Sequence, residues 1–195
     1  MNESADRNNG PDTADQYEIV AATRHWLEVA VIGLNLCPFA KAVHVKQQIR
    51  YTVTQASSED ELLAVLRDEL SLLAKADANE IDTTLLIHPQ ALTDFIDYTA
   101  FLRKADRLLR SQGHEGTLQI ASFHPAYEFA GSAPDDIENC SNRSPFPMLH
   151  LLREDSIERA VAVFPDAGEI YERNIETLRR LGHTGWQRLF MQDPV

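Results

Sequence analysis

Cysteine and long apolar runs are scarce in this sequence of 195 residues. Its two cysteines, Cys37 and Cys140, form no Cys-x-x-Cys pair and no zinc-ligand framework, and a disulfide between them is not expected in a reducing compartment. No apolar run approaches the roughly 20 residues that a membrane helix needs. Residues 1–15 lack the basic and apolar segments of a secretory signal. We therefore expect a cytoplasmic protein without a membrane partner.

Positive charge is also scarce. The chain has 18 Lys and Arg against 30 Asp and Glu, which gives a formal net charge of −12. Such a surface repels phosphate backbones, and no basic stripe interleaved with aromatic residues is present, so nucleic acid is not an expected partner. Glycine-rich phosphate loops of Walker or Rossmann spacing are absent, and so is the Gly-x-Ser-x-Gly elbow. The sequence therefore has none of these common enzyme signatures.

The rest of the composition is that of an ordinary globular domain, with 44% hydrophobic and 25% charged residues. Residues 1–14 contain almost no apolar side chains, so we predict a disordered tail there. Residues 15–195 show no repeat or linker. We predict that they form a single α/β domain.

Five segments of this domain have the apolar spacing or the boundary residues of helices. Gly33 is expected to end the first helix in the left-handed conformation that glycine adopts cheaply. The predicted helices begin at Tyr17, Ser58, Thr93, Asp155 and residue 166, and four of them end at Gly33, Gly113, Pro165 and Gly182. Ser58–Glu61 is a capping-box sequence ahead of an apolar helix face formed by Leu62, Leu66, Leu70 and Leu73. Thr93–Asp94 is expected to cap a second helix, whose apolar residues are Phe95, Ile96, Leu102, Leu108 and Leu109.

Four short runs alternate, or are continuously apolar, as strands are. They span residues 49–53, 83–87, 118–123 and 148–152, with a long polar loop over residues 126–142. Strands that alternate with helices imply parallel pairing. The sequence therefore predicts a four-stranded, mostly parallel sheet with flanking helices, in which the last strand returns antiparallel after the long loop.

Histidines follow two of these strands directly. Ile87-His88-Pro89 ends one strand and Phe123-His124-Pro125 ends the next. Ligands of open α/β sheets bind at the carboxyl ends of parallel strands, and adjacent strands lie about 4.8 Å apart, so the two rings are expected to meet there. The alternative is that each histidine is an ordinary polar residue before a turn, and this alternative is stronger for His88.

The segment Asn142-Arg143-Ser144-Pro145-Phe146-Pro147 offers an anion site. Arg143 presents a planar fork of donors that suits a carboxylate or phosphate, flanked by neutral donors on Asn142 and Ser144. The alternative is an arginine that ties down the preceding loop through backbone carbonyls. His150 follows on the last strand, on the face opposite Leu149 and Leu151. We predict that His124, Arg143 and His150 converge on one pocket, whereas Arg153 and Glu154 are expected to form a surface ion pair.

Cys37 precedes a proline, and proline is favoured at the first position of a helix. Cys37 would then cap a short helix whose N-terminus, together with Lys41, lowers the pKa of the thiol. The alternative is a cysteine buried in a helix corner, where burial raises the pKa of the thiol instead.

Three long motifs resemble those of one bacterial family, also seen in some plants, that is a domain of unknown function. They are GLNLCPFAK, ASFHPAYEFAG and NRSPFPMLHLLRE, and the resemblance runs from Tyr17 to about Gly182. The matching motif positions are Asn35, Cys37, Pro38, Phe39, His124, Pro125, Phe129, Asn142, Arg143, Ser144, Pro145, Pro147, His150, Arg153 and Glu154. An aromatic residue often stands in the family at the position of Cys140, which implies that Cys140 is neither a nucleophile nor an essential ligand. The resemblance implies membership and no mechanism.

Three functional hypotheses remain open. The favoured one is an enzyme acting on a small anion, with Arg143 as clamp, His124 and His150 in acid–base roles and Cys37 as nucleophile or acid, assisted by Asn35, Asn142, Ser144 and His88 in ligand binding. The second is a metal site built from His124, His150 and His88, completed by Cys37 or by Asp135 or Asp136. The third is a binding module without catalysis that recognises an anion through Arg143.

Overall fold

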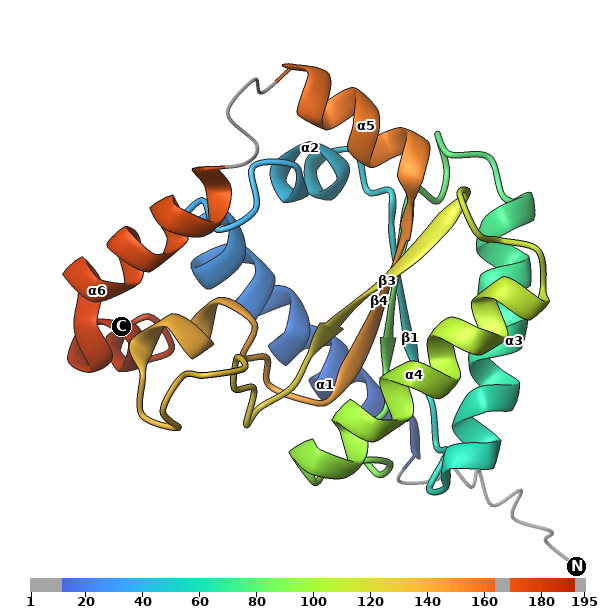
Figure 1. The fold of residues 1–195 in the computed structure, drawn as a ribbon, viewed down its shortest axis with the longest axis horizontal. Coiled ribbons are helices and arrows are strands. Elements are labelled where there is room, and N and C mark those ends of the chain that lie inside the picture. Colours follow the sequence, from blue (N-terminus) through green and yellow to red (C-terminus); the bar gives the residue numbers. More distant parts are fainter. Residues whose placement is uncertain (1–11, 164–168, 192–195) are drawn as a thin grey trace, which may run out of the picture.

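A computed structural model describes residues 12–163 and 169–191. Its elements follow the order expected from the sequence, with a four-stranded sheet among helices (Figure 1). The strands are β1 (Ile49–Val53), β2 (Thr83–Ile87), β3 (Leu118–Phe123) and β4 (Met148–Arg153). The helices are α1 (Asp12–Trp26), the π-helix η1 (Leu27–Ile32), α2 (Ala40–Val45), α3 (Glu59–Lys75), α4 (Phe95–Ser111), the 3-10 helix η2 (Ile137–Ser141), α5 (Glu154–Val163) and α6 (Ile170–Arg188).

The sheet is mixed, and the prediction of mostly parallel pairing is wrong. Its strand order is β1-β2-β4-β3, so β4 lies between β2 and β3. Only β1 and β2 pair in parallel, whereas β4 is antiparallel to both of its neighbours. The chain returns from the long loop into the centre of the sheet, which makes two of the three pairings antiparallel. The antiparallel direction of the last strand is as predicted.

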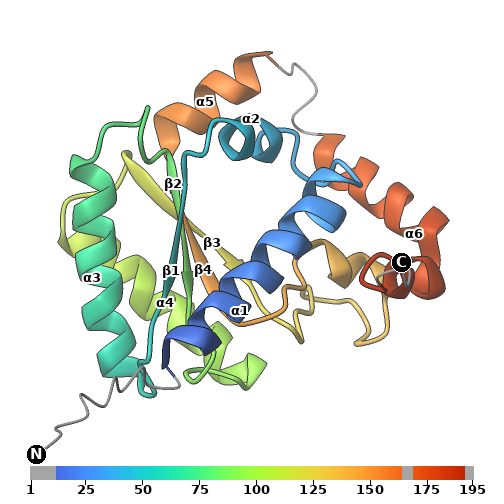
Figure 2. The ribbon, with the colours of Figure 1, turned by 180° about the vertical axis from the view of Figure 1, so that it is seen from behind.

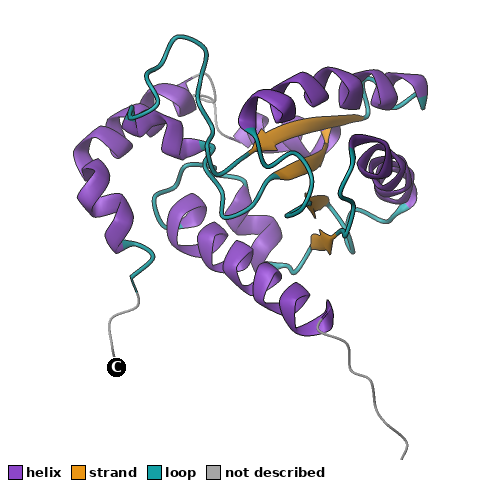
Figure 3. Ribbon diagram, turned by 90° about the horizontal axis from the view of Figure 1, so that it is seen from below, coloured by secondary structure: helices purple, strands orange, loops and turns teal. Residues whose placement is uncertain are grey.

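Helices cover both faces of the sheet, as the views from behind and from below show (Figures 2 and 3). Leu86, Leu149 and Leu151 pack against α3 and α4, with Tyr98 and Phe101 of α4 fully buried. Leu85, Ile87 and Met148 pack on the opposite face against Trp26, Leu27, Ala30 and Val31 of α1 and η1. Leu85, Leu86 and Ile87 thus contact opposite faces in turn, because successive side chains of a strand point to opposite faces of the sheet.

A third, smaller core lies away from the sheet. Leu178 of α6 packs there against Leu36, Ile137 and Cys140, so α6 rests on η2 and on the turn after η1. An ion pair between Arg179 Nε and Glu138 Oε1, 2.5 Å apart, adds a polar contact between α6 and η2. This packing places α6 beside the turn after η1, where Asn174 donates to the carbonyl of Leu36.

Two predicted caps are confirmed. Ser58 and Glu61 form the capping box of α3, and the side chain of Asp94 accepts from the N–H groups of Ile96 and Asp97 at the start of α4. The predicted apolar face of α4 is wrong in part, because Ile96 is 78% exposed whereas Tyr98 is buried. The helix turns by about 100° per residue, so the buried stripe passes through Tyr98, Phe101, Ala105 and Leu109.

Gly33 has a right-handed conformation (φ −61°, ψ −38°), so the prediction that it ends the helix in the left-handed region is wrong. Glycine is needed here for another reason. The π-helix brings the carbonyl oxygen of Val29 to 2.3 Å from the place of a Cβ. The left-handed residue of this turn is Asn35, with a φ of 55°.

The ends of three other predicted segments differ from the structure or lie outside the residues that it describes. The first helix begins at Asp12, so residues 12–14 of the predicted tail are helical, while residues 1–11 lie outside the described residues. The helix stop at Pro165 and the cap over residues 166–168 lie outside them as well. Gly182 interrupts α6 with a φ of 65°, but a further helical segment follows it.

Candidate functional site

The two predicted histidines lie at one edge of the sheet. β2 and β3 both run antiparallel to β4, so they point the same way and end at the same edge, with β4 between them. β2 and β3 are therefore not adjacent strands. The rings of His88 and His124 both pack against the ring of Tyr98, at centroid distances of 5.9 Å and 5.1 Å. We call His88, His124, Asn142 and Arg143 the edge cluster.

Both ring nitrogens of His124 are bound to backbone. The N–H of Ala126 donates to Nδ1 at 3.0 Å, so Nδ1 carries no proton. Nε2 carries it and donates to the carbonyl of Leu92 at 3.2 Å. Only 1% of His124 is exposed, and burial lowers the pKa of the imidazole, against the opposing effect of the Leu92 carbonyl. The neutral ring therefore joins the start of α4 to the loop after β3.

His88 is completely buried. Its Nδ1 donates to the carbonyl of Ala91 at 2.9 Å, and within the described part of the chain Nε2 has no hydrogen-bond partner. Burial lowers the pKa of His88 to about 4. His88 is therefore neutral at pH 7 and packs as an aromatic ring against Tyr98.

Arg143 binds the carbonyls of the loop that precedes it. Its Nε donates to the carbonyl of Tyr127 at 3.2 Å, and a terminal nitrogen donates to the carbonyl of Pro134 at 2.6 Å. The carbonyl of Arg143 itself accepts from the indole N–H of Trp26 at 2.8 Å. These contacts are those of the loop-anchor alternative.

The flanking residues of Arg143 are also bound internally. The side-chain amide of Asn142 donates to the carbonyl of Ser122 at 3.1 Å, and its main-chain carbonyl accepts from the N–H of His124. Ser144 is buried, and its hydroxyl donates to the carbonyl of Phe146 at 2.7 Å. Asn142 therefore fastens the returning chain to the end of β3.

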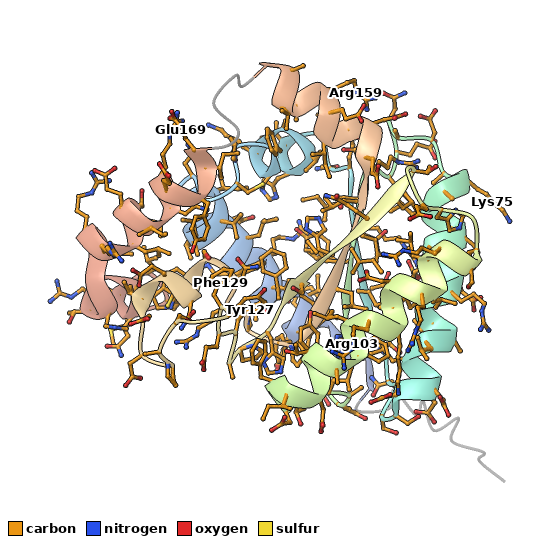
Figure 4. The ribbon with its side chains drawn as sticks, viewed as in Figure 1. Lys75, Arg103, Tyr127, Phe129, Arg159 and Glu169 are labelled. Atoms are coloured by element: carbon orange, nitrogen blue, oxygen red, sulfur yellow. The ribbon has the colours of Figure 1, made fainter. Side chains whose placement is uncertain are left out.

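Sequence reasoning missed the residue that organises the inside of this loop, Asn139. It is completely buried. Its Oδ1 accepts from the N–H of Phe129 at 3.0 Å and from the hydroxyl of Ser132 at 2.8 Å, and its Nδ2 donates to the carbonyl of Ala133 at 2.8 Å. Tyr127 and Phe129 of the same loop lie between the sheet and η2 (Figure 4). The only sequence signal for Asn139 is its place inside a long polar loop, which does not distinguish it from its neighbours.

His150 lies apart from the edge cluster. Its Cα partners are Leu85 and Ala121, so its side chain is on the α1 face, whereas Tyr98 packs on the α4 face. The hydroxyl of Thr83 donates to the carbonyl of Leu151 at 2.6 Å and accepts from Nε2 of His150 at 2.7 Å. Burial lowers the pKa of His150 to about 4. The structure therefore brings His124, Asn142 and Arg143 together and leaves His150 on the other face of the sheet.

Arg153 differs from the expected surface ion pair. Its guanidinium donates to the carbonyls of Leu73 and Ala76, both at 2.6 Å, at the end of α3. These are carbonyls that a helix leaves unpaired at its C-terminus. Arg153 thus caps α3 from the last strand.

Cys37 is partly buried and packs beside the α1 core. The helix after it begins at Ala40 with Phe39 in the cap position, so the prediction that Cys37 caps a helix begun by Pro38 is wrong. Burial raises the pKa of the Cys37 thiol, although the N–H groups of Phe39 and Ala40 act in the opposite direction. Cys140 is buried in the small third core, and burial raises its pKa too.

A pocket lies between α6 and the turn after η1, away from the edge cluster. Its volume is about 280 Å³. One wall consists of Leu34, Asn35 and Pro38, and the α6 wall consists of Ile170, Arg173, Asn174, Glu176, Thr177 and Arg180. We call this cavity the α6 pocket. Of the predicted site residues it includes only Asn35, and no sequence pattern linked that turn to α6.

Several polar groups of this pocket are already bound. The amide of Asn174 donates to the carbonyl of Leu36 at 2.9 Å, which fastens α6 to the turn. Arg173 pairs with Glu169 at 2.9 Å. Among residues 12–163 and 169–191, the side chains of Glu176 and Arg180 have no hydrogen bond or ion pair. The pocket therefore presents two opposite charges that the described protein does not neutralise.

Two further features of the described residues bear on the metal and membrane predictions. The described residues contain no group of three or more histidine, cysteine, aspartate or glutamate side chains arranged to hold a metal ion. None of the described helices combines the length and apolar character needed to span a membrane.

A family model described as protein of unknown function, DUF1415, matches residues 18–188 of the chain. The chain belongs to the DUF1415 family. The match to DUF1415 covers the edge cluster, Cys37 and every residue that lines the α6 pocket. No match was found among curated proteins, and none among solved structures.

Proposed function

We propose that this protein binds a small anionic molecule in the α6 pocket. The observation that carries the proposal is the Arg180 guanidinium, which lines a cavity of about 280 Å³ and has no partner among the described side chains. Because Arg180 lines this cavity and pairs with none of the described residues, its guanidinium is available to a ligand. A guanidinium binds carboxylates and phosphates through two parallel hydrogen bonds.

Neutral donors surround this cation. The amide of Asn35 and the hydroxyl of Thr177 line the same cavity. Asn35 has a φ of 55°, a backbone conformation that is uncommon for residues other than glycine. Asparagine adopts it more readily than most residues, and this turn holds Asn35 at the wall of the pocket.

The contacts favour this pocket over the edge cluster as the anion site. Arg143 and Asn142 already bind backbone carbonyls, and both nitrogens of His124 are bound as well. An anion at Arg143 would compete with those bonds. Catalysis by His124, His150 and Cys37 stays a prediction, and the proposal does not depend on it.

Isothermal titration with phosphate, sulfate, acetate and hexanoate, at constant ionic strength, tests the proposal. We expect at least one of these anions to bind, and Arg180→Gln to weaken that binding by about tenfold, the loss of one charge-assisted contact. Arg188→Gln is the matched control, because Arg188 is an exposed α6 arginine outside the pocket. Absence of binding by all four anions, or equal losses in both variants, would refute the proposal.

A further inference from the structure

We infer that the ligand of the α6 pocket is a small zwitterion of the α-amino acid class, an inference that rests on the proposed function. The geometry behind it is the placement of Glu176 and Arg180 on one wall of the cavity. Residues four apart lie on the same side of a helix, separated by about 6 Å along its axis. The pocket thus presents a carboxylate and a guanidinium side by side.

These two side chains have the order, glutamate first, that favours an ion pair within a helix. Within the described part of the chain, however, they form no ion pair with each other or with another residue. A simple anion is attracted by Arg180 and repelled by Glu176. A molecule that carries an ammonium group next to its carboxylate satisfies both charges at once.

The other residues of the pocket wall indicate which kind of side chain such a ligand carries. Leu34, Pro38 and Ile170 supply apolar surface. Ile170 lies six residues before Glu176 and ten before Arg180, about 9 Å and 15 Å along α6, so its apolar side chain is at the end remote from these two charges. The cation at that end, Arg173, is paired with Glu169. The pocket therefore favours a ligand with its charges at one end and an uncharged side chain at the other.

Matched pairs of probes test this inference by isothermal titration. Leucine is compared with 4-methylpentanoate, norleucine with hexanoate, and glutamine with 4-carbamoylbutanoate, since each pair differs only in the ammonium group. We expect at least one amino acid to bind about tenfold more tightly than its partner. Glu176→Gln is expected to abolish that preference without weakening the binding of the carboxylate. Glu172→Gln is the control, because Glu172 is an exposed α6 residue outside the pocket.

The outcomes separate this inference from the proposed function. Carboxylates that bind as tightly as their amino acids would overturn the zwitterion inference, and a dependence on Arg180 would still support anion binding. A preference for the amino acid that survives in Glu176→Gln would overturn the role of Glu176. Failure of every amino acid and carboxylate to bind would overturn the zwitterion inference, and the proposed function would fall with it only if phosphate and sulfate also do not bind.

Discussion

The edge cluster and the α6 pocket both gather polar side chains, and they use them differently. The side chains of His124, Asn142 and Arg143 form hydrogen bonds with backbone groups of the protein itself. Glu176 and Arg180 face a cavity and bind none of the described residues. The first arrangement holds a loop in place, and the second leaves charge for a ligand.

This difference follows from what each region has to stabilise. The chain leaves β3, makes the long loop and returns as β4 into the middle of the sheet. A loop of that length has many backbone carbonyls and N–H groups, and buried ones need partners. Side chains such as Arg143 and Asn139 supply those partners. α6 satisfies its own backbone through hydrogen bonds within the helix, so its side chains are not needed for that purpose and make other contacts, as Asn174 and Arg179 do.

Asn139→Ala is expected to have the largest effect on the loop region. The change leaves the N–H of Phe129, the hydroxyl of Ser132 and the carbonyl of Ala133 without their partner in a buried site. We expect the free energy of unfolding, measured with urea, to fall by about 4 kcal/mol. Asn79→Ala, at an exposed turn, is the control and should change it by less than about 1 kcal/mol. A loss in Asn139→Ala no larger than in the control would mean that Asn139 does not organise the loop.

The buried histidines predict a pH dependence of stability. The pKa of His88 is about 4 in the folded protein, below its ordinary value in the unfolded chain, so protonation favours unfolding. The stability that neutral His88 contributes to the folded protein is fully present above pH 6.5. It decreases as the pH falls towards 4, and the free energy of unfolding falls by an amount on the order of 3 kcal/mol. His88→Asn keeps a donor for the Ala91 carbonyl and should make the dependence of unfolding free energy on pH shallower in that window, while His150, whose pKa is also about 4, continues to contribute. A wild-type slope in His88→Asn would contradict the assignment of this pH dependence to His88.

Local patterns predicted much of the fold because their causes are local. The boundaries of β1, β2 and β3 agree with the predicted runs, and Ser58 and Asp94 cap helices as expected. Alternation and capping depend on a few consecutive residues. The strand order depends on where the returning chain finds an open position in the sheet, and nothing in the residues of β4 specifies that position.

The site was harder to predict for the same reason. The sequence predicted that His150 faces away from Leu149 and Leu151, and the structure confirms it. It also singled out Asn142 and Arg143 as ligands of an anion, which stays a prediction. It did not indicate that the partners of Arg143 are carbonyls, because any residue supplies a carbonyl. The α6 pocket joins Asn35 to Arg180 across most of the chain, and only tertiary packing brings them together.

A pair of arginine variants tests the contrast between the two regions directly. Arg143→Gln removes the bonds to the carbonyls of Tyr127 and Pro134, so the free energy of unfolding should fall by about 1–2 kcal/mol. Its affinity for the anions that bind wild-type protein should stay within about twofold. Arg180→Gln should show the reverse, with weakened binding and a stability change below about 0.5 kcal/mol. Anion binding that is lost in Arg143→Gln and kept in Arg180→Gln would move the site to the edge cluster.

Asn35 offers the smallest and finest test, because two substitutions separate its backbone role from its side-chain role. At a φ of 55°, glycine is tolerated, whereas alanine costs about 1 kcal/mol or slightly more. Asn35→Gly should therefore unfold with nearly the wild-type free energy, and Asn35→Ala should lose about 1 kcal/mol. Both variants lack the amide that lines the α6 pocket, so both should bind the anion about threefold more weakly, the effect of one neutral hydrogen bond. Equal stabilities of the two variants would contradict the left-handed turn, and wild-type binding by both would remove the Asn35 side chain from the site.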